Sequence, residues 1–336
     1  MLYALARSAL FRLDPEVAHD VALKSLCAMG PAASLLGSGG SHDESRRVMG
    51  LDFANPVGLA AGLDKNAEYI DALAALGFGF IEVGTVTPRP QPGNPKPRMF
   101  RIPAHEALIN RLGFNNQGVE RFLANIARAR YRGILGINIG KNFDTPIERA
   151  ADDYLACLDA VHERASYVTV NVSSPNTQGL RDLQSEARLD ELLAALMERR
   201  RSLAARQGVA KPMALKVAPD LSDAEIEAIA GLAVKHGIDA IIATNTTLSR
   251  EGIAGAAHAS EAGGLSGRPL AARSTAVLAR FAQALAGRIP LIGVGGIVNG
   301  ADARAKIAAG ASLVQVYTGF IYRGPQLIAD ARRALR

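Results

Sequence analysis

From residue 50 onward, short apolar runs alternate along the chain with longer segments in which hydrophobic residues recur at the spacing of a helix face. The runs are apolar throughout, as is typical of strands buried on both faces, and they end in glycine, asparagine, threonine or lysine. The eight runs cover residues 56–62, 80–87, 134–141, 167–176, 212–219, 240–247, 290–296 and 313–319. We therefore expect eight buried strands in this larger part of the chain.

The segments between the runs predict helices, among them residues 67–76, 152–164, 189–206 and 223–236. Ser222 and Glu225 form a capping box ahead of the last of these. Regular alternation of eight strands with helices is typical of an α/β fold, the (β/α)8 or TIM barrel. A doubly wound open sheet is the alternative. It would carry one glycine-rich loop after its first strand, whereas polar residues close nearly every run here.

One connection is unusual, because the stretch 88–111 is rich in proline and too long for an ordinary loop between a strand and a helix. We expect this stretch to cross the mouth of the barrel, where the strands end. It should contain a small hairpin.

The first 40 residues predict two amphipathic helices with a Gly/Ser-rich stretch after them. Asp14 and Pro15 fit the N-cap and the first position of the second helix. The expected apolar positions are Leu2, Leu5, Ala9, Leu10 and Leu13 in the first helix and Val17, Val21, Ala22, Leu26 and Met29 in the second. We expect a helical domain over residues 1–43 and a barrel domain over residues 44–336. The helices could pack on the barrel, or they could meet a membrane or an apolar ligand.

The composition of the chain argues against several classes of protein. The chain is 49% hydrophobic and 21% charged, the balance of an ordered globular protein. Its two cysteines cannot form a disulfide framework or a cysteine-rich zinc site, and its six histidines lack metal-ligand spacing, so we expect no metal. The net charge of +6 fits an anionic membrane surface. Basic residues cluster only briefly, at 199–201, and tryptophan is absent, so we do not expect nucleic-acid binding. No apolar run reaches the length of a membrane-spanning helix, and Arg7 and Arg12 interrupt the stretch that a secretory signal needs.

Polar side chains gather at the ends of the predicted strands, where a barrel carries its ligands. Three of the eight lysines, Lys65, Lys141 and Lys216, lie at such ends, and most other polar residues there are amides or hydroxyls. An amide side chain both donates and accepts hydrogen bonds, so several of them can recognise a ring that carries carbonyl and N–H groups. The lysines can hold a carboxylate or stabilise a developing anion. We expect a flat, polar, partly anionic ligand at this mouth.

The last two strands predict a phosphate site. Gly293, Gly295 and Gly296 end the seventh run, residues 317–319 end the eighth, and a glycine-rich stretch over 263–269 could add backbone donors. In barrels these loops often bind phosphate through backbone N–H groups. A phosphorylated cofactor that faces a small substrate would fit. From the residues alone, flavin mononucleotide (FMN), pyridoxal phosphate and a phosphosugar substrate all remain open.

The motifs resemble those of one family over essentially the whole chain, the class 2 dihydroorotate dehydrogenases, which are membrane-associated and quinone-dependent. The matching stretches are NPVGLAAGLDKN, EVGTVTPRPQPGNPKPRMFR, INRLGFNNQG, GINIGKN, NVSSPNTQGLR, LKVAPDLS, IATNTT, GGLSGRPL, IGVGGI and AGASLVQVYTGFIYRGP. The resemblance implies an FMN-containing barrel that oxidises dihydroorotate to orotate in pyrimidine synthesis.

The resemblance also implies a set of site residues. The catalytic set would be Ser174 as base with Lys65, Lys216 and, as a route for the proton, Thr177. FMN would bind to Ala61, Gly62, Leu63, Asp64, Lys65, Thr85, Asn138, Asn171, Lys216, Thr244, Gly267, Gly296, Tyr317 and Thr318. The substrate would bind to Lys65, Asn110, Arg111, Leu112, Gly113, Phe114, Asn171, Asn176, Asn245 and Thr246.

The same resemblance implies the partners and the location. The N-terminal helices would form an apolar tunnel for ubiquinone or menaquinone and dock on the cytoplasmic side of a bacterial inner membrane. The protein would be a monomer or a weak dimer.

Three other functions are weighed against this one. A soluble class 1 enzyme that uses fumarate or NAD would carry a cysteine at the base position, where this chain has Ser174. A 2-hydroxy-acid oxidase would be expected to use a histidine base, and no histidine stands in a motif at a strand end. A barrel that only binds ligands is the third.

Overall fold

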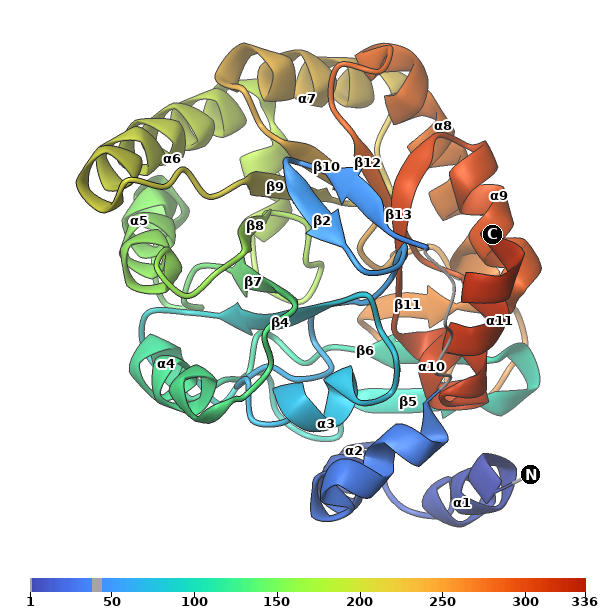
Figure 1. Cartoon of the computed structure of the whole chain (residues 1–336). Coiled ribbons are helices and arrows are strands. Elements are labelled where there is room, and N and C mark those ends of the chain that lie inside the picture. Colours follow the sequence, from blue (N-terminus) through green and yellow to red (C-terminus); the bar gives the residue numbers. More distant parts are fainter. Residues whose placement is uncertain (1, 38–43) are drawn as a thin grey trace.

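The computed structural model describes residues 2–37 and 44–336, and its centre is a closed barrel of eight parallel strands (Figure 1). The strands are β3 (Val57–Leu59), β4 (Phe80–Val86), β7 (Ile134–Ile139), β8 (Tyr167–Asn171), β9 (Met213–Val217), β10 (Ala240–Ala243), β12 (Leu291–Val294) and β13 (Ala311–Val316). Each lies within one of the predicted runs or begins two residues before it, and β13 closes the barrel by pairing with β3. The predicted TIM barrel is therefore confirmed.

Helices surround the barrel and bury their apolar faces against the outer sides of the strands. They are α3 (Ile70–Ala74), α4 (Gly118–Arg128), α5 (Ala150–Val161), α6 (Glu186–Gln207), α7 (Asp223–His236), α8 (Ala271–Leu285), α9 (Gly300–Ala308), α10 (Thr318–Arg323) and α11 (Gln326–Ala334). The predicted capping box of α7 is present, since the Ser222 hydroxyl accepts from the Glu225 N–H and the Glu225 carboxylate accepts from the Ser222 N–H.

The helix expected over 67–76 is shorter than predicted. Ala67 has a left-handed backbone with φ of 57°, and the Asp64 carboxylate accepts hydrogen bonds from the backbone N–H groups of Glu68 and Tyr69. These contacts hold residues 67–69 in a turn, so α3 begins only at Ile70.

The end of the barrel opposite the mouth is closed by a hairpin of β1 (Arg46–Val48) and β2 (Leu51–Phe53), seen in front of the barrel in Figure 1. Phe53 is fully buried and packs edge-to-face on Phe80, with the ring centroids 5.0 Å apart. Phe80, Tyr167, Ile242 and other inward side chains fill the interior. The interior of the barrel is thus a packed core that the hairpin covers at this end.

The proline-rich stretch forms the predicted hairpin, with strands β5 (Met99–Ile102) and β6 (Ala107–Asn110). A third strand, β11 (Gly264–Gly267), joins β6 antiparallel to it and was not predicted. It comes from the glycine-rich stretch after β10. The resulting small sheet lies beside the barrel mouth (Figure 1).

The N-terminal helices α1 (Leu2–Leu10) and α2 (Pro15–Ala28) lie next to this sheet, and a 3-10 turn over Gly30–Leu36 follows. Asp14 caps α2 as predicted. Only Ala18 and Leu23 of α2 are buried, whereas Val17, Val21 and Met29 are exposed. The expected apolar face of α2 therefore points largely away from the barrel. Of the Gly/Ser-rich stretch, residues 38–41 lie outside the described part of the chain.

Polar contacts fasten these helices to the barrel. Arg98 pairs with Glu16 at 2.9 Å, Arg7 donates to the Tyr322 carbonyl at 2.8 Å, and the Tyr3 hydroxyl donates to the Ile321 carbonyl. Within residues 2–37 and 44–336, no helix has the length and apolar character needed to cross a bilayer.

Candidate active site

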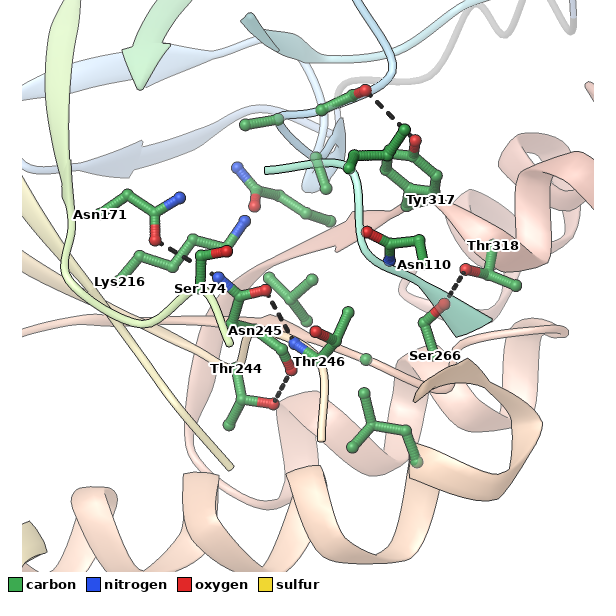
Figure 2. Close-up of a pocket in the computed structure, with 18 of the residues that line it drawn as sticks. Asn110, Asn171, Ser174, Lys216, Thr244, Asn245, Thr246, Ser266, Tyr317 and Thr318 are labelled. Carbon is green, nitrogen blue, oxygen red and sulfur yellow. Dashed lines mark hydrogen bonds between the residues drawn. The ribbon is translucent and has the colours of Figure 1, made fainter. Parts of the chain in front are cut away.

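A pocket opens at the carboxyl ends of the barrel strands, and most of the predicted site residues line it. They are Ala61, Gly62, Lys65, Thr85, Asn110, Leu112, Gly113, Phe114, Asn171, Ser174, Asn176, Lys216, Thr244, Asn245, Thr246, Gly267, Gly296, Tyr317 and Thr318. Strand ends from all around the barrel and the β5–β6 hairpin meet here. Figure 2 shows Asn171, Ser174, Lys216 and Asn245 on one side of this pocket, with Ser266 and Thr318 on the other.

Ser174 lies in an amide-rich part of this pocket. Its hydroxyl accepts a hydrogen bond from the Asn176 N–H at 3.2 Å, and the Asn176 side chain donates to Asn110 at 3.0 Å. Asn245 donates to the Asn171 side chain at 3.3 Å. The buried side-chain oxygens of Asn176 and Thr246 have no partner in the described part of the chain. Buried polar atoms normally carry a hydrogen bond, so these two oxygens indicate a polar ligand.

Arg181 fastens the segment that carries Ser174. Its guanidinium donates to the Ser173 carbonyl at 3.1 Å, to the Asp220 carboxylate at 2.9 Å and to the Thr246 carbonyl at 2.8 Å. These bonds join the loop after β8 to the ends of β9 and β10. The backbone on both sides of Ser174 is thereby held against the other strand ends.

The opposite end of the pocket is a backbone cradle after β12. Gly295 and Gly296 have φ of 108° and 77°, a region that favours glycine. A Cβ atom at Gly296 would stand 2.2 Å from Ala271 Cα, so no larger residue fits there. Close backbone approach of this kind suits a phosphate held by N–H groups. Across from the glycines, the Thr318 hydroxyl donates to the Ser266 hydroxyl at 2.8 Å.

Two lysines give the pocket positive charge, the half-buried Lys65 and the buried Lys216. Burial, followed by the nearby Arg98, lowers the pKa of Lys65 to about 8, and its ammonium donates to the Gly62 carbonyl at 2.9 Å. Burial also lowers the pKa of Lys216, whose ammonium forms no hydrogen bond with any residue that the structure describes. A buried ammonium without a partner is costly. The pocket therefore suits a group that brings acceptors or negative charge to Lys216.

Five of the predicted site residues do not line this pocket, and neither does Lys141. Asn138 lies beneath it and donates to Glu82 at 2.9 Å while it accepts from Thr85. Lys141 turns to the carbonyls of Asn142 and Thr145, at 3.0 and 2.8 Å. The others are Leu63, Asp64, Arg111 and Thr177.

Leu63, Asp64, Arg111 and Thr177 lie close to the main pocket but have other surroundings. Asp64 caps the turn before α3, and both Leu63 and Asp64 line a second cavity, next to α2. Arg111 pairs with Glu261 at 2.8 Å beside the small sheet. Thr177 is buried on the Ser174 loop, and its hydroxyl has no partner among the described residues.

A buried network under the pocket was not predicted. The Glu82 carboxylate, fully buried, accepts from the Tyr167 hydroxyl at 2.9 Å and from Gln315 at 2.8 Å, in addition to Asn138. Through Asn138 this network orients Thr85 and Asn171, which line the pocket. The signal in the sequence was a lone acidic residue in the apolar run 80–87. Ser266 and Gln315 also line the pocket and were missed.

A family model described as dihydroorotate dehydrogenase matches residues 45–336. The chain belongs to this family. It is 61% identical to dihydroorotate dehydrogenase (quinone) of Methylococcus capsulatus, over 100% of this chain and 99% of that one. It is 60% identical to dihydroorotate dehydrogenase (quinone) of Burkholderia multivorans, over 99% of this chain and 97% of that one.

Solved structures of dihydroorotate dehydrogenase from Eimeria tenella share the fold of this family member. The complex with ferulenol has a TM-score of 0.87 and 40% identity, and the match covers 96% of this chain and 90% of that one. The ligand-free form has a TM-score of 0.86 and 40% identity, and the match covers 96% of this chain and 94% of that one. The resemblance to the quinone-dependent dihydroorotate dehydrogenases is therefore confirmed.

The second cavity lies between α2 and the mouth. Glu16, His19 and Asp20 line it from α2, and Lys65 and Leu112 line both this cavity and the main pocket. Burial, followed by the charge of Lys65, lowers the pKa of His19 to about 4, so this imidazole is neutral at pH 7. The two cavities thus share a wall, and α2 forms the outer side of the second one.

Proposed function

We propose that this chain oxidises dihydroorotate to orotate, with FMN in the barrel mouth and a membrane quinone as the final electron acceptor. One observation carries the proposal: a single pocket joins a glycine cradle for phosphate to an amide-rich end that contains Ser174, with the unpartnered Lys216 in the same pocket. When bound, FMN takes a hydride from the substrate and passes electrons to the next acceptor.

The residues present fit FMN. Gly295, Gly296 and Thr318 would hold its phosphate, Thr85 and Asn171 would meet the polar edge of its ring, and Lys216 would favour added negative charge on that ring. Asn138 acts from below by orienting Thr85 and Asn171. Asp64 shapes the turn that carries Lys65.

The amide-rich end fits the dihydroorotate ring, which carries carbonyl and N–H groups. Asn110, Asn176, Asn245 and Thr246 would bind these groups, and the Lys65 ammonium would attract the carboxylate. The Ser174 hydroxyl would take a proton from the ring carbon next to a carbonyl. Its own proton would leave by way of Thr177 and ordered water, and the unpartnered Thr177 hydroxyl supports this route.

The cavity beside α2 is the proposed quinone site, because it shares a wall with the main pocket and α2 forms its outer side. Its lining is more polar than the expected apolar tunnel, since Glu16, His19, Asp20, Asp64 and Lys65 line it together with Leu23, Leu63 and Leu112. Most of the large apolar side chains seen exposed lie in this part of the chain: Leu5, Leu13, Val17, Val21, Met29, Leu35 and Leu36. We propose that they dock on the cytoplasmic side of a bacterial inner membrane. A monomer or weak dimer remains the prediction for the oligomeric state.

An anaerobic titration tests the function. We expect the purified protein to be yellow, dihydroorotate to bleach it, and ubiquinone or menaquinone to restore the colour. Recovery with fumarate or NAD in place of quinone would indicate a class 1 acceptor. Failure of dihydroorotate to bleach a protein that holds FMN would rule out the donor, and a protein that stays colourless with added FMN would be a different kind of barrel.

The Lys65 pKa of about 8 predicts a pH dependence of substrate binding. The ammonium attracts the carboxylate fully below this pH and loses its charge above it. The Kd of orotate should therefore rise as the pH passes 8, by up to about tenfold per unit. Flavin absorbance changes on orotate addition between pH 7 and 9 measure this.

The Lys65→Met variant is the control for this pH series. It should bind orotate more weakly at every pH, and its Kd should lack the rise above pH 8. If the Kd of orotate rose equally with pH in the variant and in the unmodified protein, the pH dependence would come from a group other than Lys65.

A further inference from the structure

Lys306, on α9, is a buried cation behind the glycine cradle. Its side chain is only 1% exposed, and its ammonium donates to the hydroxyls of Ser274 at 2.5 Å and Thr275 at 2.9 Å, both on α8. None of the carboxylates in the described part of the chain forms an ion pair with it. Asp302, one turn earlier on α9, already accepts from the Val298 and Asn299 N–H groups. A positive charge on Lys306 would thus have no negative partner among the described residues.

Ser274 connects this lysine to the cradle. The Ser274 hydroxyl lies 2.9 Å from the Gly295 carbonyl oxygen, and Gly295 and Gly296 both line the main pocket. The same hydroxyl also lies 2.9 Å from the Leu270 carbonyl oxygen and 3.2 Å from that of Ala271, so its one proton is shared among three acceptors. A trans peptide holds its C=O and N–H on opposite sides. With the Gly295 carbonyl turned to Ser274, the Gly296 N–H points away from α8. Hydrogen bonds thus link Lys306 through Ser274 to the peptide that carries a backbone donor of the cradle.

We propose that Lys306 acts through Ser274 as a positioning residue for the FMN phosphate, by orienting the Gly295–Gly296 peptide and by placing a positive charge behind the cradle. The inference rests on the proposed function, since it assumes that FMN phosphate occupies this cradle. Burying an unpaired ammonium costs stability, and even buried ion pairs can often be replaced by apolar residues without loss of stability. Packing alone therefore does not explain a lysine at this position. A phosphate on the other side of the loop supplies the negative charge that the protein does not.

The effect of burial on the pKa of Lys306 is consistent with this role. Loss of contact with water lowers its pKa to about 7, and Asp302 acts in the opposite direction. A nearby dianion favours the charged form of such a group. Binding of a phosphate in the cradle would therefore keep Lys306 protonated.

The test compares two flavins that differ in the phosphate. Holoenzyme is stripped of flavin, and the Kd for FMN and for riboflavin is measured by flavin fluorescence in the unmodified protein and in Lys306→Met. We expect the Kd of FMN to rise roughly tenfold in the variant while the Kd of riboflavin stays the same. A general packing defect would weaken both flavins equally, and either this result or no change in either flavin would overturn the proposal.

Two further variants keep the test decisive. Ser274→Ala keeps the lysine but removes the link to Gly295, so it should also lower the preference for FMN over riboflavin. Thr275→Val removes the other partner of Lys306, whose hydroxyl donates to the Ala271 carbonyl and not to Gly295, and should leave the preference unchanged. If Lys306→Met does not fold, an unchanged preference in Ser274→Ala overturns the proposal. If the unmodified protein itself does not bind FMN, the proposed function fails instead.

Discussion

Replacing Ser174 by alanine should slow the reduction of bound flavin by dihydroorotate by about 10²- to 10⁴-fold, the usual contribution of a general base. The Ser174 hydroxyl is 6% exposed and lies in the pocket among Asn171, Asn176 and Asn245. In the part of the chain that the structure describes, no histidine and no cysteine lines this pocket. The variant therefore has no neighbouring group of those types to take over the proton.

Stopped-flow bleaching of the flavin under anaerobic conditions measures this effect. The Kd of orotate is the control for an intact pocket, and it should change little because the variant keeps every amide. Ser185→Ala is a matched control, since among the described residues its exposed hydroxyl bonds only to the Asp182 carbonyl. An unchanged bleaching rate in Ser174→Ala would remove Ser174 from the mechanism. Ser174→Cys should keep part of the activity.

The barrel could be predicted from the sequence because its strands are buried on both faces. Such strands appear as uniform apolar runs, and eight of them in regular alternation with helices leave few other folds. The mouth followed from the same pattern, since the carboxyl ends of all the strands meet there. Gly296, Asn171 and Lys216 could thus be placed in one pocket although they are far apart in the chain.

The direction of each side chain could not be predicted in this way. Lys141 ends its strand as Lys216 does, yet its ammonium turns to two backbone carbonyls in its own loop. Asn138 and Asn171 stand on neighbouring strands, but Asn138 points down to Glu82. Both asparagines point into the barrel, since Asn138 is in register with Thr169, two residues before Asn171 on the same face. They differ in depth along the barrel axis, and the alternation of side chains along a strand does not report that depth.

Contacts between distant segments were also beyond the sequence pattern. β11 pairs with β6 although about 150 residues separate them, and its four residues include two glycines, a weak signal for a strand. The link from Lys306 to Gly295 joins three elements in the same way. Local propensity carries no information on such pairings, because they arise when the barrel closes.

Deleting residues 1–40 should abolish quinone reduction while dihydroorotate still bleaches the flavin. The deletion removes α2, which supplies Glu16, His19 and Asp20 to the proposed quinone site, and most of the exposed apolar residues. The main pocket keeps all of its lining residues, since none comes from this segment. Separate assays of flavin reduction by dihydroorotate and reoxidation by quinone distinguish the two half-reactions.

A second variant separates the quinone site from membrane docking. In Leu5→Ser/Val21→Ser, both changed side chains are exposed, at 72% and 42%, so the cavity beside α2 stays intact. This variant should reoxidise normally with a short-chain, water-soluble quinone but slowly with a long-chain quinone in anionic vesicles, because binding to the bilayer depends on buried apolar area. The deletion should fail with both quinones. Full-rate reoxidation of the deleted protein by either quinone would show that electrons leave the barrel by another route, and the N-terminal helices would then serve only to pack on it.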